Sequence, residues 1–340
     1  MSAGKGTSLR ILSAGPGVTV QDGGRHGYLR YGVTVAGPMD PFSHAIANGV
    51  LGNAAECAAL EVSLGGVEVT TEGGRVTLAV AGGDFEITLD GRPMPSALHL
   101  ALEPGAKLRI RAGQSGAWCY LAVAGGIDVP DVLGSRATHT RSHLGGHEGR
   151  VLRAGDVLST GGPAGEETPP ARILAPELLR SSEVIRALPG PQADYFTEAA
   201  IADFLTGPWT IGPRGDRMAC FLEGPVLKHS EGFNIVSDGI TMGAIQVPGE
   251  GQPIVLMADR QPTGGYPKIA TVIGADLGLL AQARPGAKIR FRSVTHVEAV
   301  EARRRQAEVL ARGFVTEPLV RTKFTSEFLL GINLIDGVFG

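Results

Sequence analysis

Short apolar segments separated by glycine- and proline-containing turns run along most of the chain. Within them apolar residues alternate with polar ones or follow one another, which is typical of strands with one or two buried faces. Before residue 161, the pattern predicts strands at 76–80, 85–89, 107–111 and 118–123. After residue 172, it predicts strands at 183–188, 209–211, 244–247, 253–258 and 288–291. We therefore expect a mainly β fold.

Apolar residues at helical spacing predict a few helices. The first runs from Asp40, whose carboxylate can cap it, to Gly52, and Pro41 suits its first turn. A second is predicted to open at Pro267 and to end before the proline at position 285. Two more are predicted within 194–205 and 296–312. We expect these helices to accompany the sheets without forming a bundle of their own.

Glycine is unusually frequent. The chain has 50 glycines in 340 residues, about twice the roughly 7% of ordinary soluble proteins. Each glycine inside a helix costs about 1 kcal/mol, so this composition disfavours long helices. The hydrophobic content of 43% is nevertheless sufficient for a buried core.

The length and one internal repeat predict two related folding units. A turn and strand at 103–110 recur at 284–291, and 340 residues suit two domains. The stretch GGPAGEETPP at 161–170 is small, acidic and bounded by proline, as linkers are. We expect a first β-barrel subdomain at 1–160, a linker at 161–172, a second β-barrel subdomain at 173–295, and a C-terminal helix with an apolar tail at 296–340.

The charge of the chain is nearly balanced, with 31 basic and 34 acidic residues. No basic surface for nucleic acid is indicated. No apolar run reaches the roughly 20 residues that cross a bilayer, and the first residues do not resemble a signal peptide. We therefore expect neither nucleic acid nor a membrane as a partner, and a cytoplasmic location. Cys57, Cys119 and Cys220 have no paired spacing and are expected to be reduced, buried residues.

Several common catalytic motifs are missing from the sequence. It contains no GxxxxGK[ST] phosphate loop, no GxSxG elbow, no GxGxxG stretch, and no lysine flanked by methionines that could carry biotin. His139, His143 and His147 have the spacing of one helix face, but glycines interrupt that stretch. No carboxylate or cysteine completes a ligand shell there. We expect a polar loop and no metal site.

Polar residues gather in a first glycine-rich stretch, between residues 15 and 61. Arg25, Asp40 and Asn48 supply donors and acceptors there, and the glycines allow the backbone to approach a ligand closely. A network of helix caps and turns would explain the same residues. Both interpretations stay open at this point.

A second stretch, at 237–268, is denser in polar residues. An apolar strand ending at residue 258 leads into a glycine turn and the predicted helix start, where sites are often found. Lys268 can neutralise an anion, Tyr266 can donate a hydrogen bond, and Asp259 can act as a base or hold Lys268. Backbone N–H groups of Gly264 and Gly265 at a helix entry would suit an anion. The remaining candidate substrate-binding residues are Gln246, Gln261 and Thr263.

These polar stretches contain the motifs of a known family. The chain resembles the carboxyltransferase A/B-type proteins, a family that also includes the second subunit of allophanate hydrolase, KipA and the C subunit of 5-oxoprolinase. The matching motifs are GPGVTVQDGGRHGY (15–28), GPMD (37–40), IAN (46–48), ALE (59–61), GGHEGRVLRAGDVL (145–158), LPGPQADYF (188–196), GDRM (215–218) and GAIQVPGEGQPIVLMADRQPTGGYPKIATVIGADL (243–277). The chain departs from the family's usual residues at Gly215, Ala219, Phe221 and Pro262.

The resemblance implies a pair of cyclophilin-like β-barrel subdomains that works with a KipI-like B subunit, with the active site at or near their joint surface. In bacterial 5-oxoprolinase, these two join a LamB/YcsF-like A subunit and open 5-oxoproline to glutamate with ATP. In urea carboxylase-like enzymes, the pair transfers a carboxyl group from carboxybiotin to urea. Other relatives are associated with regulation of a sporulation kinase.

Of these activities, we expect that of the C subunit of an ATP-dependent 5-oxoprolinase, with ATP bound through the complex. Lys268, Tyr266 and the backbone of the two glycines would face the oxyanion or a phosphate. Asp259 and Gln261 would orient the small amide substrate, with the first-domain residues contributing. One alternative is a component of a biotin-dependent carboxyltransferase that uses carboxybiotin on a separate carrier. The other is a non-enzymatic, KipA-like regulator that binds a KipI-like kinase inhibitor.

Overall fold

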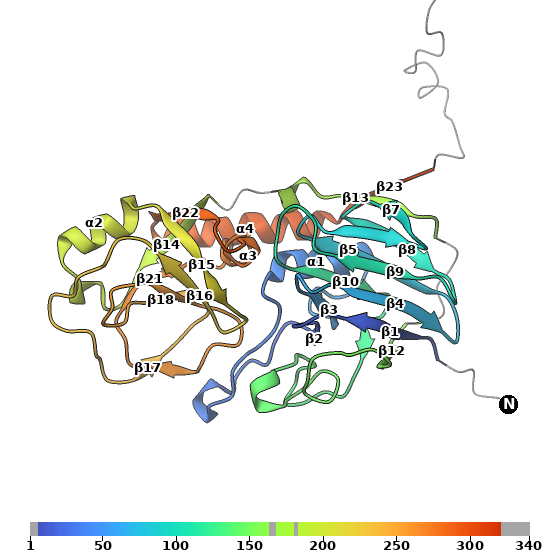
Figure 1. Cartoon of the computed structure of the whole chain (residues 1–340), viewed down its shortest axis with the longest axis horizontal. Helices are drawn as coiled ribbons and strands as arrows, with labels where there is room; N and C mark the ends of the chain where they lie inside the picture. The colour runs from blue at the N-terminus through green and yellow to red at the C-terminus, as the bar shows by residue number, and fades with distance from the viewer. Residues whose placement is uncertain (1–5, 163–167, 180–182, 321–340) are drawn as a thin grey trace, which may run out of the picture.

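The computed structural model describes residues 6–162, 168–179 and 183–320, and shows two units side by side (Figure 1). The first unit contains two seven-stranded sheets, and the second is a closed seven-stranded barrel. The mainly β fold predicted from the sequence is therefore confirmed, and the second unit is a barrel as expected.

The two sheets of the first unit pack against each other over an apolar core. One has the strand order β11 (Ile127–Asp128), β12 (Val157–Thr160), β1 (Ser8–Ala14), β4 (Val67–Glu72), β9 (Leu108–Arg111), β6 (Glu86–Leu89), β7 (Arg92–Met94). The other has the order β2 (Thr19–Gln21), β3 (Ala59–Val62), β10 (Cys119–Val123), β5 (Val76–Gly82), β8 (Leu98–Leu102), β13 (Ala171–Leu174), β23 (Val315–Pro318). Burial alternates along β4 and β8, as expected for strands with one face in the core.

The barrel closes through a parallel pair of strands. Its order is β14 (Val184–Pro189), β21 (Lys268–Val272), β18 (Ala244–Gln246), β19 (Ile254–Leu256), β16 (Ala219–Glu223), β15 (Trp209–Gly215), β22 (Lys288–Ser293), and β22 returns to β14. A two-stranded ribbon, β17 (Asp238–Gly239) with β20 (Thr263–Gly264), lies beside it. The barrel core is filled by large side chains such as Trp209 and Phe291.

Three of the four predicted helices are present. Helix α1 (Pro41–Val50) is capped by Asp40, which accepts hydrogen bonds from the backbone N–H groups of Phe42 and Ser43. Helix α2 is Glu198–Thr206, and α4 is His296–Arg312, which begins with a capping box. Among the described residues, none of the helices combines the length and the hydrophobicity that a transmembrane span requires.

The helix predicted to open at Pro267 is wrong over most of its length. Residues 268–272 form the barrel strand β21, and only α3 (Leu277–Gln282) is helical. Strand β21 pairs with β14 on one side and β18 on the other, and residues on both of its faces are buried. A fully buried strand has no period of two, and its β-branched residues Ile269, Thr271 and Val272 favour a strand.

Two strands fall outside the predicted limits of the first subdomain. Strand β13 extends past position 172, where the linker was predicted to end, and it pairs with β8 of the first unit and with β23.

Helix α4 packs on the barrel through Ala299 and Ala302, and on α1 through residues near its other end. The predicted domain boundaries stay a prediction, and the apolar tail after residue 320 lies outside the described residues.

Candidate active site between the two units

A buried arginine joins two carboxylates from different units. Arg217 follows β15 and donates to Asp259 through Nε and Nη2, at 2.9 and 2.8 Å. Its Nη1 donates to Glu61 on β3 of the first unit, and Nη2 also donates to the carbonyl of Gly37 at 2.7 Å. The side chains of Glu61 and Asp259 are 0% and 6% exposed. The ion pairs therefore lie in the contact between the two units.

Glu61 has further partners in the first unit. It accepts a hydrogen bond from the backbone N–H of Met39 at 2.7 Å and one from the Tyr120 hydroxyl at 2.8 Å. Burial raises the pKa of Glu61 while Arg217 opposes that rise, and burial also raises the pKa of Tyr120. The facing carboxylates outweigh the effect of burial on Arg217, whose pKa is raised. The arginine therefore stays charged at physiological pH.

Lys268 lies at the start of β21 with its side chain 4% exposed. Its ammonium group donates to Asp238 at 2.8 Å, and Asp238 lies on the exposed ribbon strand β17. The idea that Asp259 holds Lys268 is therefore wrong, because each of these residues has a different partner of opposite charge. Lys268 also lies opposite Gln246 in the pairing of β18 with β21.

Three other predicted residues line one cavity of about 370 Å³ beside the barrel: Gln246, Gln261 and Tyr266. Gln246 donates from Nε2 to the backbone carbonyl of Tyr266 at 3.3 Å. Thr263 and Gly264 form β20, and a Cβ at Gly264 would come within 2.6 Å of Gln246 Nε2, so a larger residue there would have to displace the Gln246 amide.

The two glycines do not stand at a helix entry. Gly264 pairs with Asp238 in the ribbon, and the carbonyl of Gly265 accepts from the backbone N–H of Ile235 at 2.9 Å. Because β21 follows them instead of a helix, no helix dipole supports anion binding by their backbone. Anion binding by the backbone of Gly264 and Gly265 therefore stays a prediction, and no helix N-terminus supports it.

Arg25 and Asn48, two of the predicted site residues in the first unit, hydrogen bond within that unit and not to Lys268. Arg25 is fully buried and donates to the carbonyls of Val132, Ser135 and Ala137. Asn48 donates to the carbonyl of Cys57 at 2.9 Å. Both residues therefore hold loops of the first unit, as expected for a network of caps and turns.

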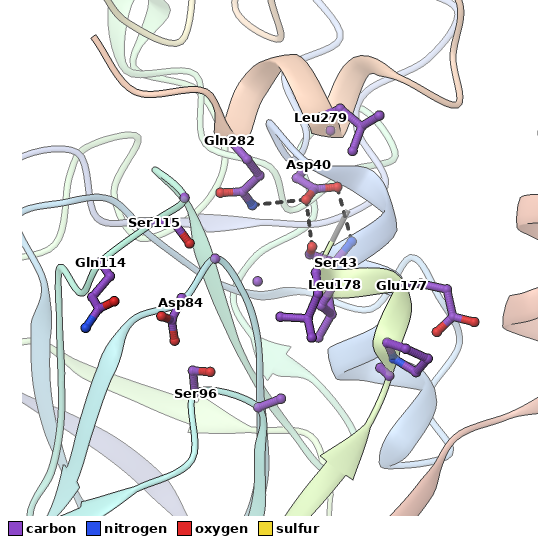
Figure 2. Close-up of a pocket in the computed structure, with 18 of the residues that line it drawn as sticks. Asp40, Ser43, Asp84, Ser96, Gln114, Ser115, Glu177, Leu178, Leu279 and Gln282 are labelled. Atoms are coloured by element: carbon purple, nitrogen blue, oxygen red, sulfur yellow. Dashed lines mark hydrogen bonds between the residues drawn. The ribbon is translucent and has the colours of Figure 1, made fainter. Parts of the chain in front are cut away.

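Asp40 stands at the junction of the units, on the wall of a cavity of about 870 Å³. Figure 2 shows its carboxylate between α1 and α3, with hydrogen bonds from Ser43 Oγ at 2.6 Å and from Gln282 Nε2 at 3.0 Å. Gln282 also accepts from the backbone N–H groups of Ala117 and Trp118. Asp40 therefore helps to dock α3 of the second unit on the first.

Another cavity, of about 690 Å³, runs along the contact between the units, and Met39, Arg217 and Asp259 line it. It shares Arg141, Arg214 and residues 215, 216, 218 and 219 with the 370 Å³ cavity. The two cavities therefore adjoin. They form one groove from the buried ion pairs to Tyr266.

Three residues of this site were not among the predicted site residues: Glu61, Arg217 and Asp238. Glu61 and Asp238 nevertheless lie within the two polar stretches at 15–61 and 237–268. Glu61 gave a usable signal, because a carboxylate inside the apolar strand β3 needs a buried partner. Arg217 was not chosen as a candidate because the residues around the GDRM motif differ from those usual in the family. In the described residues no group of three or more His, Cys, Asp or Glu side chains could hold a metal, and the 139–147 histidines lie in a loop around a single 3-10 turn (Thr140–Ser142).

The similarity of the sequence to known proteins shows which family the chain belongs to. Residues 31–293 match the carboxyltransferase domain, subdomain A and B. The chain belongs to this family. It is 41% identical over 300 residues to the C subunit of 5-oxoprolinase from Escherichia coli, covering 88% of this chain and 95% of that protein.

Other members of the carboxyltransferase domain family are longer proteins. The chain is 32% identical over 326 residues to the urea amidolyase of Lachancea kluyveri, covering 89% of this chain but 18% of that protein. The solved structure of Kluyveromyces lactis urea carboxylase matches with a TM-score of 0.84 and 28% identity, over 95% of this chain and 30% of that one. The carboxyltransferase domain thus occurs both as a separate polypeptide and as part of a larger enzyme.

Proposed function

We propose that this chain is the C subunit of an ATP-dependent 5-oxoprolinase. The observation that carries the proposal is its similarity to the C subunits of two bacterial 5-oxoprolinases along nearly the whole length of each protein. The urea amidolyases, by contrast, match only as one part of a much longer chain. The proposed partners are a KipI-like B subunit and a LamB/YcsF-like A subunit, in the cytoplasm.

The groove offers the chemistry that opening of a lactam requires. Water must add to the ring carbonyl and the C–N bond must break, which yields a carboxylate and an amine. The carbonyl oxygen gains negative charge during this step, and the Tyr266 hydroxyl, which lines the groove, would stabilise it. The Lys268 ammonium would add positive charge from its buried position beside Asp238, next to the residues that line the groove. Gln261 would hydrogen bond to the amide. Arg217 would fix the carboxylate of Asp259 at the groove wall.

ATP would be bound through the partner subunits, because the chain has no phosphate-binding loop of the Walker type. The nucleotide would supply the free energy for ring opening. In this division of labour, the chain contributes the amide-binding wall of a shared active site.

A carboxyltransferase acting on urea is the second candidate, and the match to urea carboxylase over 95% of this chain favours it. Both substrates contain an amide-type carbonyl that must be polarised, so the same residues would serve. This activity would require carboxybiotin on a separate carrier protein.

Purification of the chain together with its two proposed partner subunits, followed by measurement of ATP turnover, tests the proposal. We expect 5-oxoproline, and not urea, to stimulate turnover. Lys268→Met should abolish the stimulation while the complex still assembles. ATP turnover that is independent of 5-oxoproline in the assembled complex would contradict the proposal, and stimulation by urea with a biotin carrier would support the second candidate.

A further inference from the structure

Two arginines stand in the cavity that also holds the candidate amide-binding residues. Arg141 reaches it from the first unit, in the 3-10 turn Thr140–Ser142, and Arg214 reaches it from β15 of the second. The only carboxylate among the described residues that line this cavity is Asp216. The lining therefore carries an excess of positive charge.

Asp216 does not neutralise both arginines. One of its oxygens accepts from the backbone N–H groups of Met218 and Ala219, at 2.7 and 3.3 Å. The other lies 3.7 Å from Arg141 Nη2, beyond the distance of a good hydrogen bond. Asp216 is thus engaged by its own turn and by Arg141.

Arg214 has no carboxylate within 4.0 Å among residues 6–162, 168–179 and 183–320. Its guanidinium carbon lies 5.2 Å from the centroid of the Phe221 ring, a cation–π contact that holds the group against the cavity wall. A guanidinium held in this way keeps its N–H donors available, and two of them match the two oxygens of a carboxylate.

The substrates named for the relatives differ in whether they carry a carboxylate, a group that the guanidinium of Arg214 can bind through two hydrogen bonds. 5-Oxoproline is a five-membered lactam with a carboxylate on the carbon next to the ring nitrogen, whereas urea is neutral. The amide side chains of Gln246 and Gln261 and the hydroxyl of Tyr266 share the cavity with the arginines. One small molecule can therefore meet both sets of groups at once.

Building on the proposed function, we propose that Arg214, assisted by Arg141, binds the carboxylate of the substrate and makes this cavity selective for anionic amides. Arg214 is then a specificity-determining residue. Arg141 contributes less, because Asp216 already faces it. The carboxylate anchors the ring, and the lactam carbonyl is left for Gln246, Gln261 and Tyr266 in the same cavity.

The test is the affinity of the assembled complex for 5-oxoproline and for 2-pyrrolidinone, the same lactam without the carboxylate, measured by calorimetry. Arg214→Gln should weaken 5-oxoproline binding about ten- to hundred-fold and leave 2-pyrrolidinone binding unchanged. Arg214→Lys should fall between these values, because it keeps the charge and loses the paired donors. Arg305→Gln, on the exposed face of α4, is the matched control and should change neither affinity.

Equal weakening of both ligands, or no change in either, would overturn the inference. So would a wild-type complex that binds neither compound. These outcomes are separate from the turnover assay: a complex that hydrolyses ATP in response to 5-oxoproline but ignores Arg214→Gln refutes only the carboxylate site. A complex that discriminates by charge without turnover refutes only the proposed activity.

Discussion

Replacement of Arg217 by methionine is the sharpest test of the contact between the two units. Among the described residues, Glu61 and Asp259 each form their ion pair with Arg217 and with no other residue. Methionine keeps much of the length of the side chain but removes its charge and all its donors. The carboxylates of Glu61 and Asp259 would then stay buried at the contact between the two units with no cation beside them.

The expected loss of stability is large. Removal of one partner from a buried ion pair costs about 3–5 kcal/mol, because the remaining charge stays buried. Here two carboxylates with 0% and 6% exposed side chains lose their partner at once. The hydrogen bonds of Glu61 to Met39 and Tyr120 remain and offset part of that loss. We expect a decrease of about 3–5 kcal/mol in the free energy of unfolding at pH 8.

The loss should depend on pH. Since burial raises the pKa of Glu61, the folded protein binds this proton more tightly than the unfolded chain does. The contribution of such a group to stability is complete below its unfolded pKa and is lost as the pH rises through its folded pKa. Without Arg217 that loss is greater, because only the neutral acid tolerates burial. The difference between wild type and Arg217→Met should therefore shrink from pH 8 to pH 5.

Urea unfolding of both proteins at pH 8, 7, 6 and 5 measures this difference. The exposed ion pair of Arg305 with Glu301 on α4 provides the control, and Arg305→Met should have little effect at any pH. A difference below about 1 kcal/mol at pH 8, or one that grows on acidification, would refute the idea that Arg217 compensates buried carboxylates.

Two further substitutions test neighbouring parts of the site. Asp238→Asn should lower 5-oxoproline-stimulated ATP turnover, because the buried ammonium of Lys268 loses its carboxylate partner; unchanged kinetics would count against a role for this pair. Gly278→Ala should lower the thermal stability of the chain, by an amount typical of overpacking, about 1–3 kcal/mol. A Cβ there would lie 2.1 Å from Asp40 Oδ1, so an unchanged melting temperature would contradict the docking of α3 described above.

Matched controls exist for both substitutions. Asp203→Asn neutralises an exposed aspartate on α2 and should leave turnover unchanged. Gly239→Ala adds a methyl group where no atom lies within 4 Å, and should leave the melting temperature unchanged.

The sequence pattern correctly predicted elements whose ends or buried faces are set by residues close together in the chain. Asp40 followed by proline marks the start of α1, and the segments predicted at 76–80 and 107–111 correspond to β5 and, from Leu108 onward, to β9. The failure at Pro267 has a physical reason, since β21 is buried on both faces and has neither the period of a surface strand nor that of a surface helix.

The partners within the site could not be predicted in the same way. Lys268 and Asp238 are 30 residues apart, and Arg217 and Glu61 are 156 apart. Sequence spacing carries no information on such pairs. The first forms only when the ribbon β17 folds against the barrel strand β21, and the second only when the barrel docks on the sheets of the first unit. Candidate residues were found where several polar groups share one loop, as in 259–268. Glu61 was missed because it is a single charge within an apolar strand, and Arg217 because the residues around it depart from the family's usual ones.

The pairing of β13 with β23 has a consequence for how the barrel is attached. These two strands are hydrogen-bonded neighbours in one sheet, and all of the barrel and α4 lie between them in the chain. The barrel is therefore an insertion, tethered to the first unit by two covalent connections that leave and re-enter at one sheet edge. Such a double tether limits rotation of one unit about the other. It also means that the sheet of the first unit is completed only after the last strand of the inserted barrel has been synthesised.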